Sequence, residues 1–219
     1  MKAFVAGATG QTGRRIVQAL VKRGVPVRAL VRDRATAATI LPPEVELVVG
    51  DVLQPSSLGE AIADCTVLLC ATGAAPSFNP LGPYQIDYEG TKNLVDAAKL
   101  KGIEHFVFVS SLAVSQIFHP LNLFFLILVW KKRAEEYLQQ SGLTYTIVRP
   151  GGLKNEDNSD SIEMSSADTR FEGSIPRTKV AQTCVEALFV PSAQNKIVEI
   201  VAQPEAPAKS FEDLFSSVA

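Results

Sequence analysis

Residues 2–17 read KAFVAGATGQTGRRIV, and this stretch decides the fold. A short apolar strand meets three glycines, and a helical pattern follows at once. That order places unpaired backbone N–H groups and the positive end of a helix dipole at one point. Gly7 permits a tight turn, Gly10 lets phosphates approach the backbone, and Gly13 lets the helix pack closely on the strand. We therefore predict that a pyrophosphate rests here, with further donors from Thr9, Gln11 and Thr12; the alternative is a glycine turn with no ligand.

Strand-like apolar runs alternate with helix-like segments along the rest of the chain. The expected strands are 25–32, 45–51, 66–73, 105–111, 145–152 and 196–202, and the expected helices are 13–24, 56–64, 85–102, 130–142 and 176–190. Continuous β-branched strands between amphipathic helices predict a mainly parallel sheet that is covered on both faces. Right-handed crossovers then give a single Rossmann-like, doubly wound α/β domain over residues 1–219. The polar segment 154–175 is expected to be either a surface loop or a substrate-side lid.

Composition excludes several classes of function. The formal net charge is −2, so no global basic field attracts nucleic acid. The chain has three cysteines and no CxxC pair, which suits a reducing compartment and buried thiols. With only two histidines besides, no metal site is expected. No signal peptide precedes the first strand, so the expected location is cytoplasmic.

Several motifs together resemble the extended and atypical short-chain dehydrogenase/reductases. They are GATGQTG at 7–13, VVGDV at 48–52, ATGA at 71–74, DYEGTKNLVDAA at 87–98, FVFVSS at 106–111, KRAEEYLQQSGLTYTIVRPGGL at 132–153 and GSIPRTKVA at 173–181. Within that superfamily the chain is most similar to biliverdin reductase B-like flavin reductases and NmrA-like NAD(P)-binding proteins. The best match is to plastid and cyanobacterial members. The resemblance implies a nicotinamide dinucleotide and, for a photosynthetic source, a location in the plastid stroma.

The end of the second expected strand favours NADP(H) over NAD(H). An acidic residue there would bind an adenosine 2′-hydroxyl, whereas an arginine would pair with a 2′-phosphate. Arg32 and Arg34 flank Asp33, and adjacent side chains in a strand face opposite ways. The resemblance gives the phosphate to Arg32, with Arg34 or Arg14 as helpers; the alternative is that these are solvated surface charges.

Other cofactor contacts are expected at the carboxyl ends of the strands, where ligands bind in open α/β sheets. The resemblance assigns the adenine to Asp51 and Val52, and the ribose and pyrophosphate to Thr72 and Gly73. It places Ser110, Lys131 and the turn Pro150, Gly151 and Gly152 beside the nicotinamide.

The resemblance also implies which residues carry the chemistry. Ser111 matches the catalytic serine of the family, and Lys131 matches its lysine. The family's tyrosine would stand four residues before Lys131, where this chain has Ile127. Isoleucine cannot donate a proton, so two hypotheses remain open. The protein transfers hydride to a flat conjugated acceptor such as a flavin, a quinone or a linear tetrapyrrole, or it is a non-catalytic NADP(H)-binding scaffold or redox sensor that acts through a partner.

Other polar side chains are weaker candidates. Tyr137 lies too far round its helix to replace the missing tyrosine, and Tyr84 and Tyr88 belong to another helix. His105 begins a strand away from the ligand edge and is expected to be structural. His119 is a candidate proton donor near the substrate mouth.

The segment 121–130 is apolar except for Asn122. It is about half of the ~20 residues that span a bilayer, so no transmembrane helix is expected. Three roles remain open for it: a core or pocket wall built from Phe124, Phe125 and Trp130, a contact in a homodimer, or a docking surface for a membrane or protein partner. The chain is expected to be a monomer or a homodimer.

Overall fold

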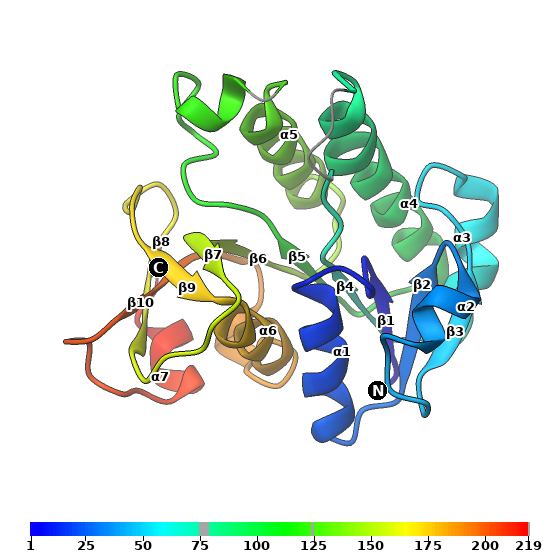
Figure 1. The fold of residues 1–219 in the computed structure, drawn as a ribbon, viewed down its shortest axis with the longest axis horizontal. Helices are drawn as coiled ribbons and strands as arrows, with labels where there is room; N and C mark the ends of the chain where they lie inside the picture. Colours follow the sequence, from blue (N-terminus) through cyan, green and yellow to red (C-terminus); the bar gives the residue numbers. More distant parts are fainter. Residues whose placement is uncertain (75–78, 124, 219) are drawn as a thin grey trace.

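The computed structural model describes residues 1–74, 79–123 and 125–218. Its centre is an eight-stranded sheet with the order β3-β2-β1-β4-β5-β6-β10-β8 (Figure 1). Neighbouring strands pair in parallel, except that β8 runs antiparallel to β10. The predicted doubly wound, mainly parallel fold is therefore confirmed. The strands of this sheet are β1 Ala3–Ala6, β2 Val27–Val31, β3 Glu46–Val49, β4 Val67–Cys70, β5 His105–Val109, β6 Tyr145–Pro150, β8 Ser161–Ser166 and β10 Lys196–Gln203.

Helices cover both faces of the sheet, and a small parallel pair of strands, β7 and β9, lies beside it. The strands of this pair are β7 Gly152–Lys154 and β9 Ser174–Pro176. The α-helices are α1 Gly13–Lys22, α2 Arg34–Ala38, α3 Pro55–Ile62, α4 Thr91–Lys101, α5 Ile127–Gln139, α6 Arg177–Glu186 and α7 Phe211–Ser216. A π-helical segment η1 Tyr84–Gly90 leads into α4, and the 3₁₀ turns are η2 Pro120–Leu123 and η3 Pro191–Ala193.

The core has two layers, because alternate residues of each strand point to opposite faces of the sheet. Val5 and Val107 face α1, α6 and α7, whereas Phe4, Phe106 and Phe108 face α3, α4 and α5. These five side chains are fully buried. Burial of each contributes about 1.5–3 kcal/mol. In Figure 1 the two helical layers lie below and above the sheet, so the carboxyl ends of its central strands open between them.

The polar segment after β6 contains a strand that the sequence analysis does not predict. Ile162 and Met164 alternate with polar neighbours in β8, and β8 pairs with β10 along its length. The alternation lets one face of the strand reach the core while the other faces water. Residues 161–166 therefore belong to the sheet, and a lid role for the remainder of 154–175 stays a prediction.

The buried cysteines and His105 have structural positions. Cys65, Cys70 and Cys184 are free and buried, as the sequence predicts. Burial raises the pKa of Cys65 to about 11 and that of Cys184 to about 12. His105 is 5% exposed at the start of β5, and its Nε2 lies 2.8 Å from Thr146 Oγ1. Its predicted structural role is thus confirmed.

Candidate functional site

The glycine turn between β1 and α1 has the tight geometry that its sequence predicts. Gly7 has a φ of +78°, a conformation that side chains disfavour, and a Cβ there would lie 2.5 Å from the Ala71 carbonyl oxygen. A Cβ on Gly13 would lie 2.0 Å from the Gly7 carbonyl oxygen. The backbone N–H groups of Gln11 and Thr12 have no recorded backbone acceptor among the described residues. The turn therefore presents free donors at the start of a ten-residue helix.

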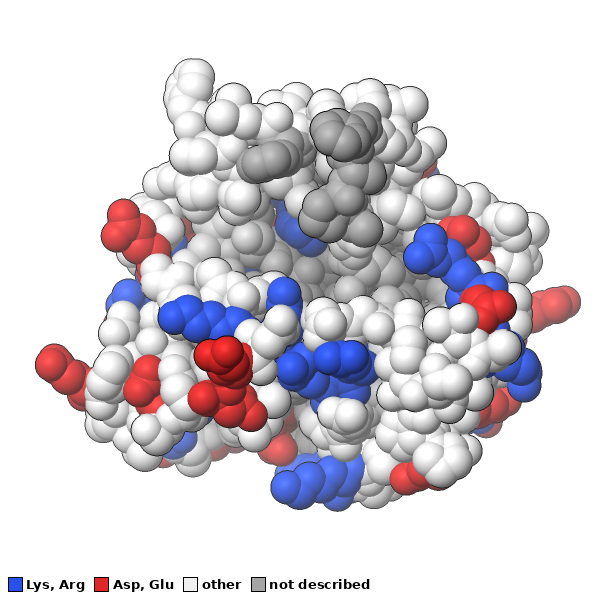
Figure 2. Space-filling view, viewed as in Figure 1, with Lys and Arg blue, Asp and Glu red and all other residues white. Residues whose placement is uncertain are grey.

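A pocket of about 320 Å³ opens over this turn, at the carboxyl ends of β1 to β4. Figure 2 shows the same face of the molecule, with a hollow between the upper helices and the start of α1. Hydrophobic side chains of Leu30, Val31 and Ile86 contribute to its wall. It is also lined by eight of the residues that the sequence predicts: Gly7, Thr9, Gly10, Arg32, Asp51, Val52, Thr72 and Gly73.

The three charged residues after β2, Arg32, Asp33 and Arg34, make different contacts. Asp33 caps α2, because its Oδ1 accepts the Thr36 N–H at 2.6 Å. Hydrogen bonding from the Thr36 side chain, followed by that from its backbone N–H, lowers the pKa of Asp33. Arg34 Nη2 donates to the Leu47 carbonyl oxygen of β3 at 2.7 Å. Of the three side chains, only Arg32 lines the pocket.

The predicted residues Ser110, Ser111 and 150–152 lie at the ends of β5 and β6, outside the lining of that pocket. Hydrogen bonds of 2.8 Å from Ser110 N to Val148 O and 3.0 Å from Leu112 N to Pro150 O continue the pairing beyond β5. Ser111 is thereby held beside the Pro150 turn. Gly151 and Gly152 follow in the same turn, tied through their N–H groups to β10 and to the backbone of Gly173. Ser110 is 5% exposed, and its Oγ has no hydrogen-bond partner among the described residues.

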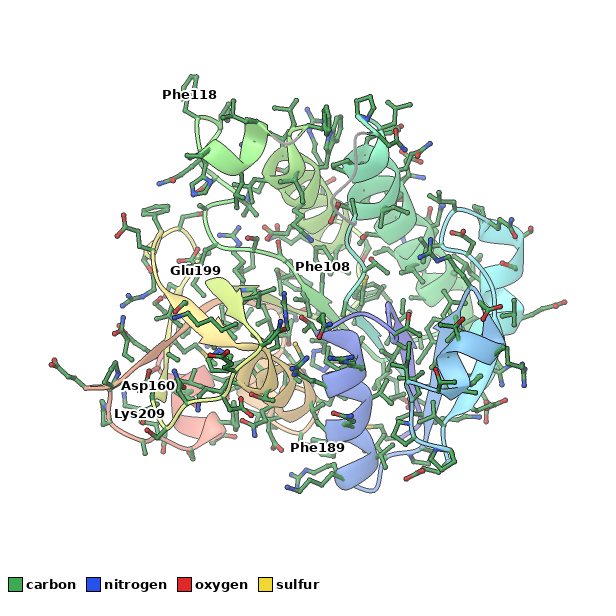
Figure 3. The ribbon with its side chains drawn as sticks, in the orientation of Figure 1. Phe108, Phe118, Asp160, Phe189, Glu199 and Lys209 are labelled. Atoms are coloured by element: carbon green, nitrogen blue, oxygen red, sulfur yellow. The ribbon has the colours of Figure 1, made fainter. Side chains whose placement is uncertain are left out.

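Lys131 reaches this edge from α5 and contacts a carboxylate that the sequence analysis does not single out. Its Nζ lies 2.9 Å from Asp87 Oδ1, and the Asp87 side chain is fully buried in η1. Asp87 Oδ2 accepts the Ala74 N–H at 3.2 Å, so it also ties down the segment after Gly73. The Lys131 Nζ stands 5.8 Å from the ring centre of Phe108, labelled in Figure 3 at the middle of the sheet. Asp87 thus links the glycine-rich pocket to the lysine.

The three tyrosines considered in the sequence analysis contact residues outside the predicted cofactor site. Tyr137 OH donates to Asp96 at 2.6 Å, and this carboxylate raises the pKa of Tyr137 to about 12. Tyr84 OH donates to Glu89 at 3.0 Å. Tyr88 packs with Tyr84 and Trp130 in an aromatic cluster. Trp130 is consequently part of the α5–η1 contact and does not line the pocket.

Ile127 begins α5, one turn before Lys131. Its side chain packs against the buried residues Ala113, Val114 and Leu128. The position to which the sequence resemblance assigns a tyrosine is therefore filled by a hydrocarbon side chain in an apolar cluster.

A buried ionic cluster braces the turn after β6. The Arg149 guanidinium is fully buried and pairs bidentately with Glu135 of α5, at 2.9 and 2.7 Å. It also contacts Glu199 of β10 at 3.1 Å and Asp168 at 2.8 Å. Glu199 accepts backbone N–H groups from residues 168–170. The cluster joins α5, β6, β10 and the turn after β8 around the nicotinamide end of the predicted site.

The apolar segment before α5 forms an exposed tip. Phe118 is fully exposed and Leu123 is 85% exposed, and Figure 3 shows Phe118 at the outer edge of the molecule. The buried Asn122 organises this tip: its Nδ2 donates to the carbonyl oxygens of residues 116 and 117, and its Oδ1 accepts the Leu128 N–H at 3.0 Å. The His119 ring nitrogen Nδ1 accepts the Leu121 N–H within the tip.

The described residues of the predicted pocket wall, Phe125 and Trp130, do not line the pocket. Phe124 lies outside the described residues, and Phe125 is 38% exposed. No helix within the described ranges is long and apolar enough to cross a membrane.

A model of the NAD(P)H-binding protein family matches residues 7–191. The chain belongs to this family. The match includes the glycine turn, the pocket and the Lys131–Asp87 pair, and it confirms the resemblance to atypical short-chain dehydrogenase/reductases.

Curated members of the family that are similar to this chain include plastid proteins and a reductase. An uncharacterised chloroplastic protein of Arabidopsis thaliana is 49% identical over 99% of this chain and 82% of its own length. Sanguinarine reductase of Eschscholzia californica is 30% identical over 98% of this chain and 95% of its own length. The chloroplastic protein TIC 62 of Pisum sativum is 36% identical over 98% of this chain, which spans 45% of that protein's length.

Solved structures of the family share the whole fold. A putative NAD-dependent epimerase/dehydratase from Bacillus halodurans has a TM-score of 0.88 and 25% identity, with 99% of each chain covered. ChuY, an anaerobilin reductase from Escherichia coli O157:H7, has a TM-score of 0.79 and 25% identity, with 95% of this chain and 100% of ChuY covered. The family thus contains reductases with this architecture.

Proposed function

We propose that this chain is a reductase that takes its electrons from NADPH. The observation that carries the choice of NADPH is the arrangement of the charged triplet. Asp33, the side chain that would bind a 2′-hydroxyl, is held by α2, whereas Arg32 lines the pocket and has no recorded ion pair within the described chain. A guanidinium in that position suits a 2′-phosphate.

The other residues of the site have separate roles in this proposal. The N–H groups of Gln11 and Thr12 hold the diphosphate, and Asp51 and Val52 lie against the adenine. Ser111 and Lys131 stand at the nicotinamide end. NADPH supplies a hydride from its reduced ring when bound. Lys131 contributes a positive charge beside the ring, and the apolar cluster around Ile127 excludes water from that side.

We further propose that the acceptor is a flat conjugated molecule, such as a flavin, a quinone or a linear tetrapyrrole. The motivation is Ile127, which leaves no hydroxyl one turn before Lys131 to protonate a ketone. A conjugated acceptor spreads the arriving negative charge over its own rings and takes a proton from water. The reductase names of the Eschscholzia and ChuY relatives support a reductase over an epimerase.

The alternative is an NADP(H)-binding scaffold or redox sensor that acts through a partner, and the same isoleucine favours it. Oxidation of NADPH, followed by absorbance with FMN, riboflavin, a quinone and biliverdin in turn, separates the two functions. We expect turnover with at least one acceptor. Tight NADPH binding without turnover of any of them would instead establish the scaffold.

Exchange of Arg32 for Ala tests the cofactor. We expect calorimetry to show about ten- to a hundredfold weaker NADPH binding and nearly unchanged NADH binding, because one charge-assisted contact is lost. Arg34→Ala is the matched control, since Arg34 is held on Leu47 and should change NADPH binding less. Equal losses of the two dinucleotides in Arg32→Ala would overturn the assignment.

The exposed tip supports a contact with another protein. Residues 112–130 carry no Asp, Glu, Lys or Arg, and the upper part of the face in Figure 2 is correspondingly uncharged. The chloroplastic relatives favour the plastid stroma as the place of that contact for a chain of photosynthetic source. Light scattering of the wild type and of Phe118→Ser/Leu123→Ser measures whether the tip joins two copies. A membrane role predicts binding of the wild type to vesicles and no binding of the variant.

A further inference from the structure

Two arginines from helices far apart in the sequence meet at the glycine turn. Arg15, in the first turn of α1, donates through Nη1 to the Gln11 carbonyl oxygen at 2.7 Å. Arg177, the first residue of α6, reaches Thr12 from the other side, with Nη1 lying 3.4 Å from Thr12 Oγ1. Both guanidiniums therefore lie beside the two residues whose backbone N–H groups are free.

These two side chains have no acidic partner among the described residues, whereas four other arginines have one. Arg23, Arg28, Arg149 and Arg170 each contact a carboxylate. No ion pair is recorded for Arg15 or Arg177 within the described ranges, and their recorded hydrogen bonds go to neutral oxygens.

The adjacent loop carries Glu156, Asp157 and Asp160, and no ion pair joins any of them to Arg15 or Arg177 within the described residues. Asp157 accepts a hydrogen bond from Thr178 Oγ1. Burial, followed by the repulsion from Arg15, lowers the pKa of Arg177. Figure 2 shows basic side chains gathered over the upper part of α1, at the centre of the face that carries the pocket. Two guanidiniums held this close gain most from an anion with more than one charge.

We propose that Arg177 and Arg15 close over the diphosphate of the bound dinucleotide, so that α6 supplies the second half of a phosphate clamp whose first half is the start of α1. The inference rests on the proposed cofactor site and adds residues to it. Arg177 contacts the diphosphate, which NADPH and NADH share, whereas Arg32 contacts the 2′-phosphate, which only NADPH has. The two arginines therefore have separable effects.

Asn155 connects this clamp to the segment after β7. Its side-chain Oδ1 accepts from Arg177 Nε at 2.9 Å, and its carbonyl oxygen accepts from Arg15 Nη2 at 3.3 Å. A diphosphate that neutralises both guanidiniums relieves their repulsion and holds the Asn155 contacts in place. Cofactor binding therefore orders residues 153–158, and hydrogen exchange of their amides slows when NADPH is added.

Calorimetry with NADPH and with NADH tests the clamp in Arg177→Gln and Arg15→Gln. We expect Arg177→Gln to weaken both dinucleotides by the same factor, about ten- to a hundredfold, with a smaller common loss in Arg15→Gln. Arg177→Lys keeps the charge and loses the bidentate geometry, so it should fall between. Lys22→Gln, which removes one positive charge from the exposed far end of α1, is the control and should bind both dinucleotides as the wild type does.

The outcomes separate the two proposals. If the wild type binds neither dinucleotide, the proposed cofactor site is refuted. If the wild type binds and Arg177→Gln binds equally well, the site stands and the clamp is refuted. A loss confined to NADPH would also refute it, because that pattern belongs to the 2′-phosphate. Thermal unfolding without dinucleotide shows whether Arg177→Gln is folded, and if it is not, Arg177→Lys and Arg15→Gln decide the question.

Discussion

Replacing Arg149 with Met tests whether the buried ionic cluster holds the turn after β6. Arg149 and Glu135 are fully buried, and the Glu199 side chain is 1% exposed. Methionine fills much of the aliphatic volume of arginine but removes the guanidinium from both carboxylates, and Glu135 keeps only Lys132, at 3.9 Å. Removal of one partner from a buried ion pair typically costs about 3–5 kcal/mol. For a domain of this size we expect the melting temperature to fall by roughly 10 °C.

Urea unfolding of Arg149→Met, followed by circular dichroism at pH 7.5, measures this loss. Arg28→Met is the control, because its partner Glu46 is half exposed and the expected loss is under about 1 kcal/mol. A deficit for Arg149→Met as small as that of Arg28→Met would refute the reasoning.

Three further predictions follow from contacts in the fold. Gly13→Ala should lower the free energy of unfolding by about 1–3 kcal/mol in urea, because its Cβ would strike the Gly7 carbonyl oxygen. Asp87→Asn should cost about 1–3 kcal/mol in the same assay, because Lys131 loses its carboxylate while the amide keeps an acceptor. Burial lowers the pKa of His105 to about 4, so NMR should find its ring neutral at pH 5. The His105 ring of the unfolded chain takes up a proton near pH 6.5, so the free energy of unfolding decreases as the pH falls from 6.5 to 4.

Each of these has its own control. Gly59→Ala, in the middle of α3, places its Cβ no closer than 3.5 Å to the Lys101 side chain and should stabilise the protein slightly. Lys92→Gln breaks a partly exposed pair with Asp96 and should cost less than Asp87→Asn. A His105 titration near pH 6.5 in the folded protein, or a harmless Gly13→Ala, would contradict the respective prediction.

The central fold follows from the sequence because its signals are local. The residues of each inner strand are mostly apolar, and each covering helix has its own amphipathic pattern, so little long-range information is needed. Strand β8 cannot be predicted from local signals. Its alternation over Ser161–Ser166 lies next to an acidic stretch, and its place in the sheet comes from pairing with β10, which begins 30 residues after β8 ends. Tertiary pairing, not local propensity, makes it a strand.

The glycine turn and Arg32 can be predicted from the sequence for the same reason, because each directly follows a predicted strand. The ionic cluster cannot be predicted in this way, because Arg149 contacts partners 14 and 50 residues away along the chain. Asp87 could have been noticed, as it is the first charged residue after Asp64 in an otherwise uncharged stretch. Arg177 stands within the quoted motif GSIPRTKVA, but only the fold brings it to Thr12.

In the proposed reductase, the pairing of Lys131 with Asp87 limits which acceptors can be reduced. A lone ammonium 4 Å from a developing anion would stabilise it by about 4 kcal/mol at an effective dielectric constant near 20. Asp87 lies 2.9 Å behind that ammonium, and its repulsion on the same anion cancels roughly half of the gain. Ile127 adds no proton, so a localised alkoxide has neither a strong counter-charge nor an acid. An acceptor that delocalises its own charge needs neither, because its anion is already stabilised when hydride arrives. NADPH oxidation with conjugated acceptors but not with simple ketones is the pattern that this electrostatic argument requires, and efficient reduction of an aliphatic ketone would contradict it.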